Sequence, residues 1–248
     1  MSSFVLVHGS WHGGWCWDKV KPLLEARGHQ VFMPDLPGHG QDNTPVAEIT
    51  LQSFTDRIGE VIDAQAEPVI LVGHSMGGVV ITQTAEYRPD KIKTLVYLCA
   101  FLPRNDESLL QLAQQDTETL ILPNLVINEA QGYHSVKEEA IRDIFYQDCP
   151  DEDVAKAKSL LAPQEALAPV ATPVQTSDDN YGRIPRVYIE CLRDQTIGPS
   201  LQKQMYTATP CQQVFTLETG HSPFFAAPDA LANHLLTVAK GVPERLGL

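Results

Sequence analysis

The chain is organised around residues 68–87, which read PVILVGHSMGGVVITQTAEY. Residues 68–72 form a β-branched and apolar run typical of a buried strand, and the residues after Gly77 have the pattern of a helix. Ser75 therefore lies on the turn between them, flanked by Gly73 and Gly77, where so sharp a bend leaves little room for side chains. The pattern is that of a nucleophile elbow, in which the serine hydroxyl projects above the sheet, although a tight turn with an incidental serine would have the same spacing.

Length and composition are typical of one α/β domain with an insertion. A chain of 248 residues can bury roughly 70–75% of its unfolded surface. Its formal net charge of −13, without a cluster of Lys or Arg, argues against nucleic acid or an anionic membrane as partner. No targeting segment or membrane-spanning run is recognisable, so we expect a cytoplasmic protein. Five cysteines at unpatterned spacings predict free thiols, with neither a disulfide framework nor a metal site.

A second glycine-rich turn, HGSWHGG at residues 8–14, follows the first apolar run at residues 4–7. Backbone N–H groups on such a turn lie at the carboxyl edge of a parallel sheet, where α/β proteins bind ligands. Elbow chemistry requires two N–H donors for an oxyanion, and we expect them from Ser10 on this turn and from Met76 at the start of the elbow helix. The glycines could instead be ordinary turn residues.

Four residues of these two turns are candidate substrate contacts. They are Gly9, Trp11 and His12 on the first turn and His74 in the elbow. Trp11 and His12 could equally be a packed aromatic and a histidine whose hydrogen bonds are satisfied within the fold. His74 is too close to Ser75 along a bent backbone to act as its base.

Apolar runs alternate with segments of helical periodicity along most of the chain. Strands are expected at residues 4–7, 30–36, 68–72, 94–101, 186–191 and 213–217. Helices are expected at residues 15–28, 50–65, 77–87, 200–206 and 230–238. Near-continuous apolar strands that alternate with helices predict a doubly wound, parallel sheet.

The alternation stops at residues 102–184, where helical segments at 107–115, 136–145 and 154–161 are separated by prolines. An insertion of this size between two strands predicts a helical lid over a core formed by residues 1–101 and 185–248. Its apolar side chains would roof a largely hydrophobic pocket and set substrate size. A helical elaboration without contact to substrate is the alternative.

Ser75, Asp194 and His221 form a candidate catalytic triad. A serine hydroxyl is a poor nucleophile until an imidazole takes its proton, and the imidazole needs a carboxylate to fix its tautomer. Asp194 and His221 each follow a late strand, so they are expected at the same sheet edge as Ser75. Asp35 and His39 also follow a strand, but an Asp there is more often a turn or capping residue.

Taken together, these segments resemble the α/β-hydrolase fold family, and within it the plant-type methylesterases and hydroxynitrile lyases. The resemblance is carried by FVLVHGSWHGGW at residues 4–15, by residues 21–25 and 28–29, and by the elbow and the two later loops. It implies about six core strands, and it does not extend to the lid. It also implies these roles: Ser75 as nucleophile, His221 as base, Asp194 as its orienter, and Ser10 and Met76 as oxyanion donors. Residues 37–40, PGHG, depart from the plant pattern, so a plant hormone ester is not implied.

The leading hypothesis is a carboxylic ester hydrolase without cofactor or metal, a monomer or homodimer that acts on small, largely apolar esters through an acyl-enzyme. A hydroxynitrile lyase would use the same triad. The lyases of this group resemble one another in having a lysine after the catalytic histidine, where this chain has Ser222. A ligand receptor that has kept the fold is a third hypothesis.

Overall fold

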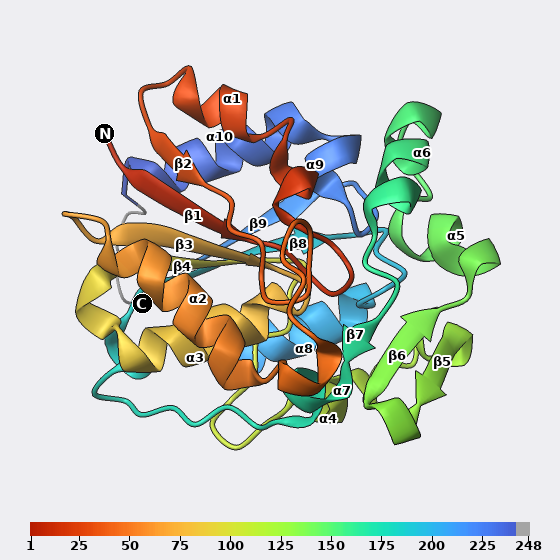
Figure 1. The fold of residues 1–248 in the computed structure, drawn as a ribbon. Coiled ribbons are helices and arrows are strands. Elements are labelled where there is room, and N and C mark those ends of the chain that lie inside the picture. Colours follow the sequence, from red (N-terminus) through yellow and green to blue (C-terminus); the bar gives the residue numbers. More distant parts are fainter. Residues whose placement is uncertain (242–248) are drawn as a thin grey trace.

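A six-stranded sheet in the order β2-β1-β3-β4-β8-β9 lies at the centre of the computed structural model, which describes residues 1–241 (Figure 1). All neighbouring strands in it pair in parallel. They are β1 (Ser3–Val7), β2 (Gln30–Phe32), β3 (Val69–His74), β4 (Ile92–Leu98), β8 (Arg186–Cys191) and β9 (Gln213–Leu217). The predicted parallel sheet of about six strands is confirmed.

Helices cover both faces of this sheet, with α1 and α10 on one face and α2, α3 and α8 on the other (Figure 1). The helices outside the insertion are α1 (Lys21–Glu25), α2 (Leu51–Asp63), α3 (Gly77–Tyr87), α8 (Pro199–Ala208), α9 (Pro223–Ala226) and α10 (Pro228–Ala239). In α2, the Thr50 hydroxyl caps the helix by accepting the Ser53 N–H, and Phe54, Ile58 and Ile62 turn toward the sheet and are buried. Each face of the sheet therefore has its own hydrophobic cluster.

Two elements near the N-terminus are shorter than the sequence predicted. The expected helix at residues 15–28 is divided into the 3-10 helix η1 (Gly14–Trp17) and the short helix α1. Pro22 has no N–H to continue a hydrogen-bonded helix from η1 and lies in the first turn of α1, which ends at Glu25. The chain then turns at Gly28, with φ +79°. The strand expected at residues 30–36 ends at Phe32, because Pro34 cannot donate to a neighbouring strand.

Residues 102–184 leave the sheet after β4 (Figure 1). Their helices and strands lie beyond that end of the sheet, and the chain after residue 171 runs back past α3 to the start of β8. These helices and strands are α4 (Leu109–Ala113), β5 (Leu125–Asn128), β6 (Tyr133–Val136), α5 (Ile141–Phe145), α6 (Asp151–Leu160), β7 (Glu165–Ala166) and α7 (Leu167–Ala171). The sequence predicted helices here and missed the antiparallel sheet β5-β6-β7. As a result, the helix expected at residues 136–145 starts later, since Val136 ends a strand.

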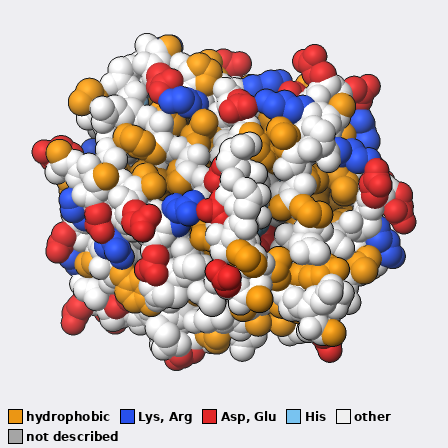
Figure 2. All heavy atoms as spheres, in the orientation of Figure 1, with side chains coloured by type: hydrophobic (Ala, Val, Ile, Leu, Met, Phe, Trp, Pro, Cys, Tyr) orange, Lys and Arg blue, Asp and Glu red, His pale blue; other side chains and the backbone are white. Residues whose placement is uncertain are grey.

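Short 3-10 helices join several of these elements: η2 (Val46–Glu48), η3 (Pro89–Lys91), η4 (Leu122–Asn124), η5 (Glu129–Gln131), η6 (Glu138–Ala140) and η7 (Tyr181–Arg183). Within residues 1–241, every helix is too short or too polar to cross a bilayer. Acidic and basic side chains are interspersed on the face shown in Figure 2. The predicted core extends to residue 248, so its last part, 242–248, lies outside the described residues. Cytoplasmic location and oligomeric state stay predictions.

Strand order brings the sequence-predicted loops to one edge of the sheet. The chain passes from β1 outward to β2 and then back to β3 on the other side of β1, and this reversal of direction leaves a crevice at the strand ends. Val7 at the end of β1 pairs with Gly73 near the end of β3. Residues 8–13, here called the β1 loop, therefore lie beside Ser75, and the loops after β8 and β9 end at the same edge.

Candidate active site

Ser75 occupies the tight turn between β3 and α3, as predicted. Its backbone is in the left-handed region with φ 55°, an uncommon conformation for a residue other than glycine. The flanking glycines permit the bend: a Cβ on Gly73 would lie 2.5 Å from the Gly77 carbonyl oxygen, and one on Gly77 would lie 2.8 Å from the carbonyl oxygen of Val7. The strained turn leaves the Ser75 side chain at the wall of a cavity.

His221 and Asp194 meet at the same edge of the sheet. The Nδ1–H of His221 donates to Asp194 Oδ2 at 2.8 Å, and both side chains are buried. A carboxylate acceptor at Nδ1 fixes the tautomer, so Nε2 of neutral His221 is left as a proton acceptor. His221 and Ser75 line the same cavity, although no hydrogen bond joins their side chains within the described structure.

Asp194 is held by its own loop and by a glutamine that sequence reasoning missed. Asp194 Oδ1 accepts the N–H groups of Thr196 at 2.7 Å and Ile197 at 3.0 Å. The amide of Gln202, fully buried on α8, donates to Asp194 Oδ2 at 3.1 Å and accepts the Cys191 N–H. These three donors hold the carboxylate in position beside His221. A lone polar residue on an apolar helix face was the only sequence signal for Gln202.

The two predicted oxyanion donors lie next to each other. Ser10 Oγ contacts Met76 Sδ at 3.2 Å, and Met76 is the N-cap residue of α3. Neither backbone N–H donates a hydrogen bond to any residue in the described part of the chain. Two unpaired N–H groups beside Ser75, one of them at a helix N-terminus, form a ready site for a negatively charged oxygen.

His12 and Trp11 line the cavity as predicted, and each also has structural hydrogen bonds. The Nδ1–H of His12 donates to the Ser10 carbonyl at 2.8 Å, and Nε2 accepts the hydroxyl of Tyr146 at 2.7 Å. Burial lowers the pKa of His12 to about 4, so this ring stays neutral. Trp11 has φ 58°. Within the described residues, each of its hydrogen bonds joins it to a residue of the insertion.

Gly9 and His74 do not line the cavity among the described residues, so nothing in the structure supports their predicted contact with substrate, which stays a prediction. Gly9 lies behind Ser75, where a Cβ would come 2.7 Å from Ser75 Cβ. His74 is fully buried and donates from Nε2 to the backbone carbonyl of His221 at 2.8 Å. Burial lowers its pKa well below the usual value, so it is neutral. His74 therefore supports the backbone of His221.

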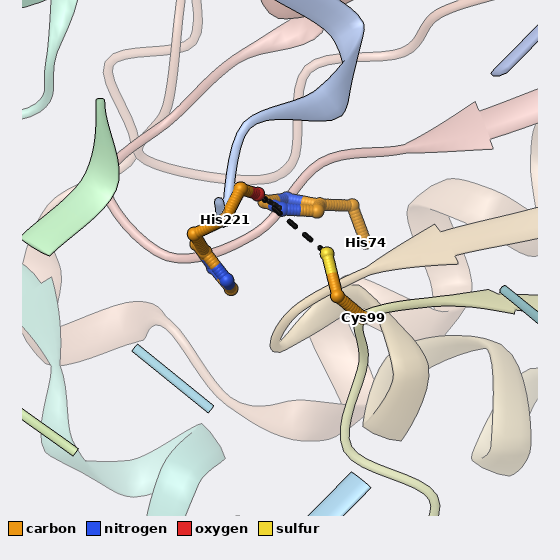
Figure 3. Close-up of side chains that lie close together, drawn as sticks. All are labelled: His74, Cys99 and His221. Atoms are coloured by element: carbon orange, nitrogen blue, oxygen red, sulfur yellow. Dashed lines mark hydrogen bonds between the residues drawn. The ribbon is translucent and has the colours of Figure 1, made fainter. Parts of the chain in front are cut away.

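His74, Cys99 and His221 also bring three ligand atoms within 4.8 Å of one another (Figure 3). In Figure 3, His74 and Cys99 both approach the backbone carbonyl of His221, and the imidazole of His221 extends away from it. His74 Nε2 carries the proton that it donates to this carbonyl. The cluster is therefore a support for the His221 loop.

Asp35 is a turn residue, as the sequence analysis favoured. Its two carboxylate oxygens accept the N–H groups of Gly14 at 2.7 Å and Gln41 at 2.9 Å. His39 is buried, and its Nε2 lies 2.9 Å from Glu165 Oε2 in the insertion. Neither Asp35 nor His39 lines the cavity with Ser75.

The cavity has a volume of about 320 Å³ and lies between the sheet edge and residues 102–184. Its lining residues are mainly aliphatic and aromatic: Phe101, Leu109, Leu110, Ala113, Ile121, Leu122, Leu125, Ile127, Phe145, Leu167, Val170 and Ala171. Four of the residues that line it are exposed: Leu110, Ile127, Glu129 and Ala171. No lysine or arginine lines it among residues 1–241.

The fold and this arrangement are those of an α/β hydrolase, and comparison with known proteins agrees. The sequence pattern of the Alpha/beta hydrolase family matches residues 4–234. The chain therefore belongs to that family, and the resemblance seen in its sequence is confirmed.

Several relatives are esterases by name. Methylesterase 2 of Arabidopsis thaliana is 33% identical over 250 residues, which cover 95% of each chain. The pyrethroid hydrolase of Sphingobium wenxiniae is 30% identical over 253 residues, which cover 98% of this chain and 90% of that one. Among solved structures, a pyrethroid hydrolase from Sphingobium faniae JZ-2 is similar with a TM-score of 0.88 and 28% identity, covering 97% of this chain and 98% of the other.

Proposed function

We propose that this protein is a cofactor-free serine hydrolase that cleaves carboxylic esters of small, largely apolar substrates through a triad of Ser75, His221 and Asp194. The relatives indicate a carboxylic ester hydrolase. One observation carries the assignment of the residues: the carboxylate-bound His221 and the strained Ser75 line one cavity beside two unpaired N–H groups. Each part has a role in acyl transfer.

The reaction has two halves. Ser75 Oγ attacks the ester carbonyl while His221 Nε2 takes the hydroxyl proton, and the N–H groups of Ser10 and Met76 receive the negative oxygen. Collapse of this intermediate expels the alcohol, which His221 protonates, and leaves an acyl group on Ser75. His221 then deprotonates a water molecule that releases the acid, so atoms and charge balance without a further reagent.

The volume and the apolar lining of the cavity support small, largely apolar esters as substrates. At about 320 Å³ the cavity is at the small end of ligand pockets, which span roughly 300–1,000 Å³. Its apolar lining favours hydrocarbon groups on either side of the ester. We propose that residues 102–184 act as a lid that shapes this wall over the core of residues 1–101 and 185–248, because α4, α5 and α7 all contribute lining residues.

Ser75→Ala tests the proposal. We expect kcat for p-nitrophenyl acetate to fall on the order of 10⁴- to 10⁶-fold with an unchanged melting curve, since the hydroxyl is at a cavity wall. Labelling by a fluorophosphonate probe should disappear, whereas the exposed Ser159→Ala variant should react like the wild type. Retention of more than a tenth of the activity in Ser75→Ala would refute the nucleophile. Wild-type protein that is neither labelled nor active would favour a receptor.

A further inference from the structure

We propose that Glu165 of the insertion is a positioning residue for the β1 loop: its carboxylate holds the Trp11 N–H so that the neighbouring Ser10 N–H faces the reacting carbonyl. The inference deepens the proposed function and rests on it. The insertion would then have two roles. It would shape the pocket, and it would also hold the backbone that carries an oxyanion donor.

Residues of the insertion hold Trp11 by all three of its polar groups. Its backbone N–H donates to Glu165 Oε2 at 2.9 Å, and its carbonyl accepts the Ala162 N–H at 2.7 Å. Its indole N–H donates to the His134 carbonyl at 3.4 Å. A left-handed conformation, with φ 58°, is costly for tryptophan and persists only where surrounding contacts determine it. Here those contacts come from the insertion.

These bonds fix the two peptide units on either side of Ser10. The peptide that joins Ser10 to Trp11 is held at both ends, by His12 Nδ1 on its carbonyl and by Glu165 on its N–H. In the preceding peptide, the Gly9 carbonyl accepts from His8 Nδ1 at 2.8 Å. Of these four polar groups, only the Ser10 N–H has no partner within the described structure. The Ser10 N–H lies in the Gly9–Ser10 peptide, whose carbonyl end is held by His8, and the bonds to the following peptide hold Ser10 itself in place. Without the bond from Trp11 to Glu165, Ser10 could shift and carry this donor away from Ser75.

The carboxylate that holds Trp11 is charged. His39 lies between two acceptors, with Nε2 2.9 Å from Glu165 and Nδ1 2.9 Å from the Pro37 carbonyl. Both ring nitrogens must carry a proton to donate to both. Burial alone would lower the pKa of His39, but the Glu165 carboxylate raises it. Burial alone would likewise raise the pKa of Glu165, and the charge of His39 lowers it. A charge-assisted bond to Trp11 is about twice as strong as a neutral one.

A purely structural role does not account for this pair. Breaking a buried ion pair is strongly destabilising, but replacing both partners by apolar side chains of similar volume is often neutral or stabilising. Glu165 is fully buried, and its Oε1 has no hydrogen-bond partner within the described residues. The desolvation of these charges therefore offsets much of the free energy that the ion pair contributes to holding the insertion on the core. What an apolar pair could not supply is an acceptor for the Trp11 N–H.

Two double variants separate these roles. Glu165→Leu/His39→Phe replaces the pair with apolar groups and removes the acceptor. Glu165→Gln/His39→Phe also removes the ion pair but keeps an amide oxygen that can face Trp11. With p-nitrophenyl acetate and butyrate, we expect the leucine variant to lose about 10- to 100-fold in kcat for both esters, because the oxyanion donor is misplaced. Its KM should change less than about twofold, and the glutamine variant should regain kcat to within about threefold of wild type.

Asp153→Asn is the matched control, because Asp153 is another buried insertion carboxylate, paired with Lys19 away from the β1 loop. Its kcat should equal that of the wild type even where its melting temperature falls. Equal kcat in the two folded double variants, or an equal loss in Asp153→Asn, would overturn the inference. The single variants Glu165→Leu and Glu165→Gln provide a second comparison if a double variant does not fold. Activity that survives Ser75→Ala in parallel would count against the proposed function instead.

Discussion

Gly9 should be one of the least replaceable residues of the protein, although it does not line the cavity. A Cβ built on Gly9 lies 2.7 Å from Ser75 Cβ, and 3.1 Å and 3.2 Å from His74 Nδ1 and the His74 carbonyl oxygen. None of these atoms is the free end of a flexible side chain. The change to test is therefore Gly9→Ala, which adds a single methyl group behind the catalytic serine.

The size of the effect follows from this geometry. Ordinary van der Waals contact begins near 3.4 Å, so the new methyl and Ser75 Cβ must separate by about 0.7 Å. A misplacement of about 1 Å at a reacting group reduces the rate about 10²-fold. We expect Gly9→Ala to lower kcat about 30- to 100-fold, which corresponds to about 2–2.7 kcal/mol of transition-state stabilisation.

Steady-state hydrolysis of p-nitrophenyl acetate measures kcat and KM, and circular dichroism melting shows whether the variant is folded. Gly182→Ala is the control, since its Cβ would lie 3.2 Å from Asp178 Oδ1 and 3.3 Å from the Ser177 carbonyl oxygen, and none of these residues lines the cavity. It should retain wild-type kcat. A folded Gly9→Ala enzyme with kcat within threefold of wild type would refute the reasoning, because Ser75 would then not depend on the close approach of β1 and β3.

Three other outcomes are expected. Asp194→Asn should lower kcat by several orders of magnitude through the wrong His221 tautomer, whereas Asp35→Asn should lower only the melting temperature; the reverse order would identify Asp35 as the catalytic acid. His39 faces Glu165, His8 and Asp35, and its pKa is raised, so its stabilisation is present at low pH and lost as pH rises through that value. Between about pH 6 and 9, the melting temperature of the wild type should therefore fall more than that of Glu165→Leu/His39→Phe. Parallel curves of melting temperature against pH for the two proteins would contradict a charged pair. Mandelonitrile should release no benzaldehyde above the buffer rate at mildly acidic pH, since no cation in the described cavity wall can stabilise a departing cyanide.

The sheet could be predicted from the sequence because its strands are fully buried. All six residues of β3 are inaccessible to solvent, and such a run can hardly be anything but a central parallel strand. The insertion lacked this signal. Strands β5, β6 and β7 contain only four, four and two residues, and strands of this length are difficult to distinguish from loops.

The candidate site shows the same contrast. Ser75, Asp194 and His221 could be brought together from the sequence because each lies within a few residues after the end of a strand, and parallel strands end at a common edge. Glu165 could not be found, because its bond to Trp11 joins residues 154 positions apart and depends on the fold of the insertion. Local sequence therefore indicates the proposed catalytic residues, and it does not indicate those that hold them in place.

The cavity wall has no basic side chain among the described residues, and this has a consequence for the end of the reaction. An ester enters as a neutral molecule, but the acid formed from it ionises at neutral pH. The N–H groups of Ser10 and Met76 can hold one oxygen of that anion, but no lysine or arginine of the described wall pairs with its charge, Glu129 is part of the wall, and the whole chain has a formal net charge of −13. A charge without a counter-ion in an apolar pocket is costly. We therefore expect the acid to leave readily for water and product inhibition to be weak.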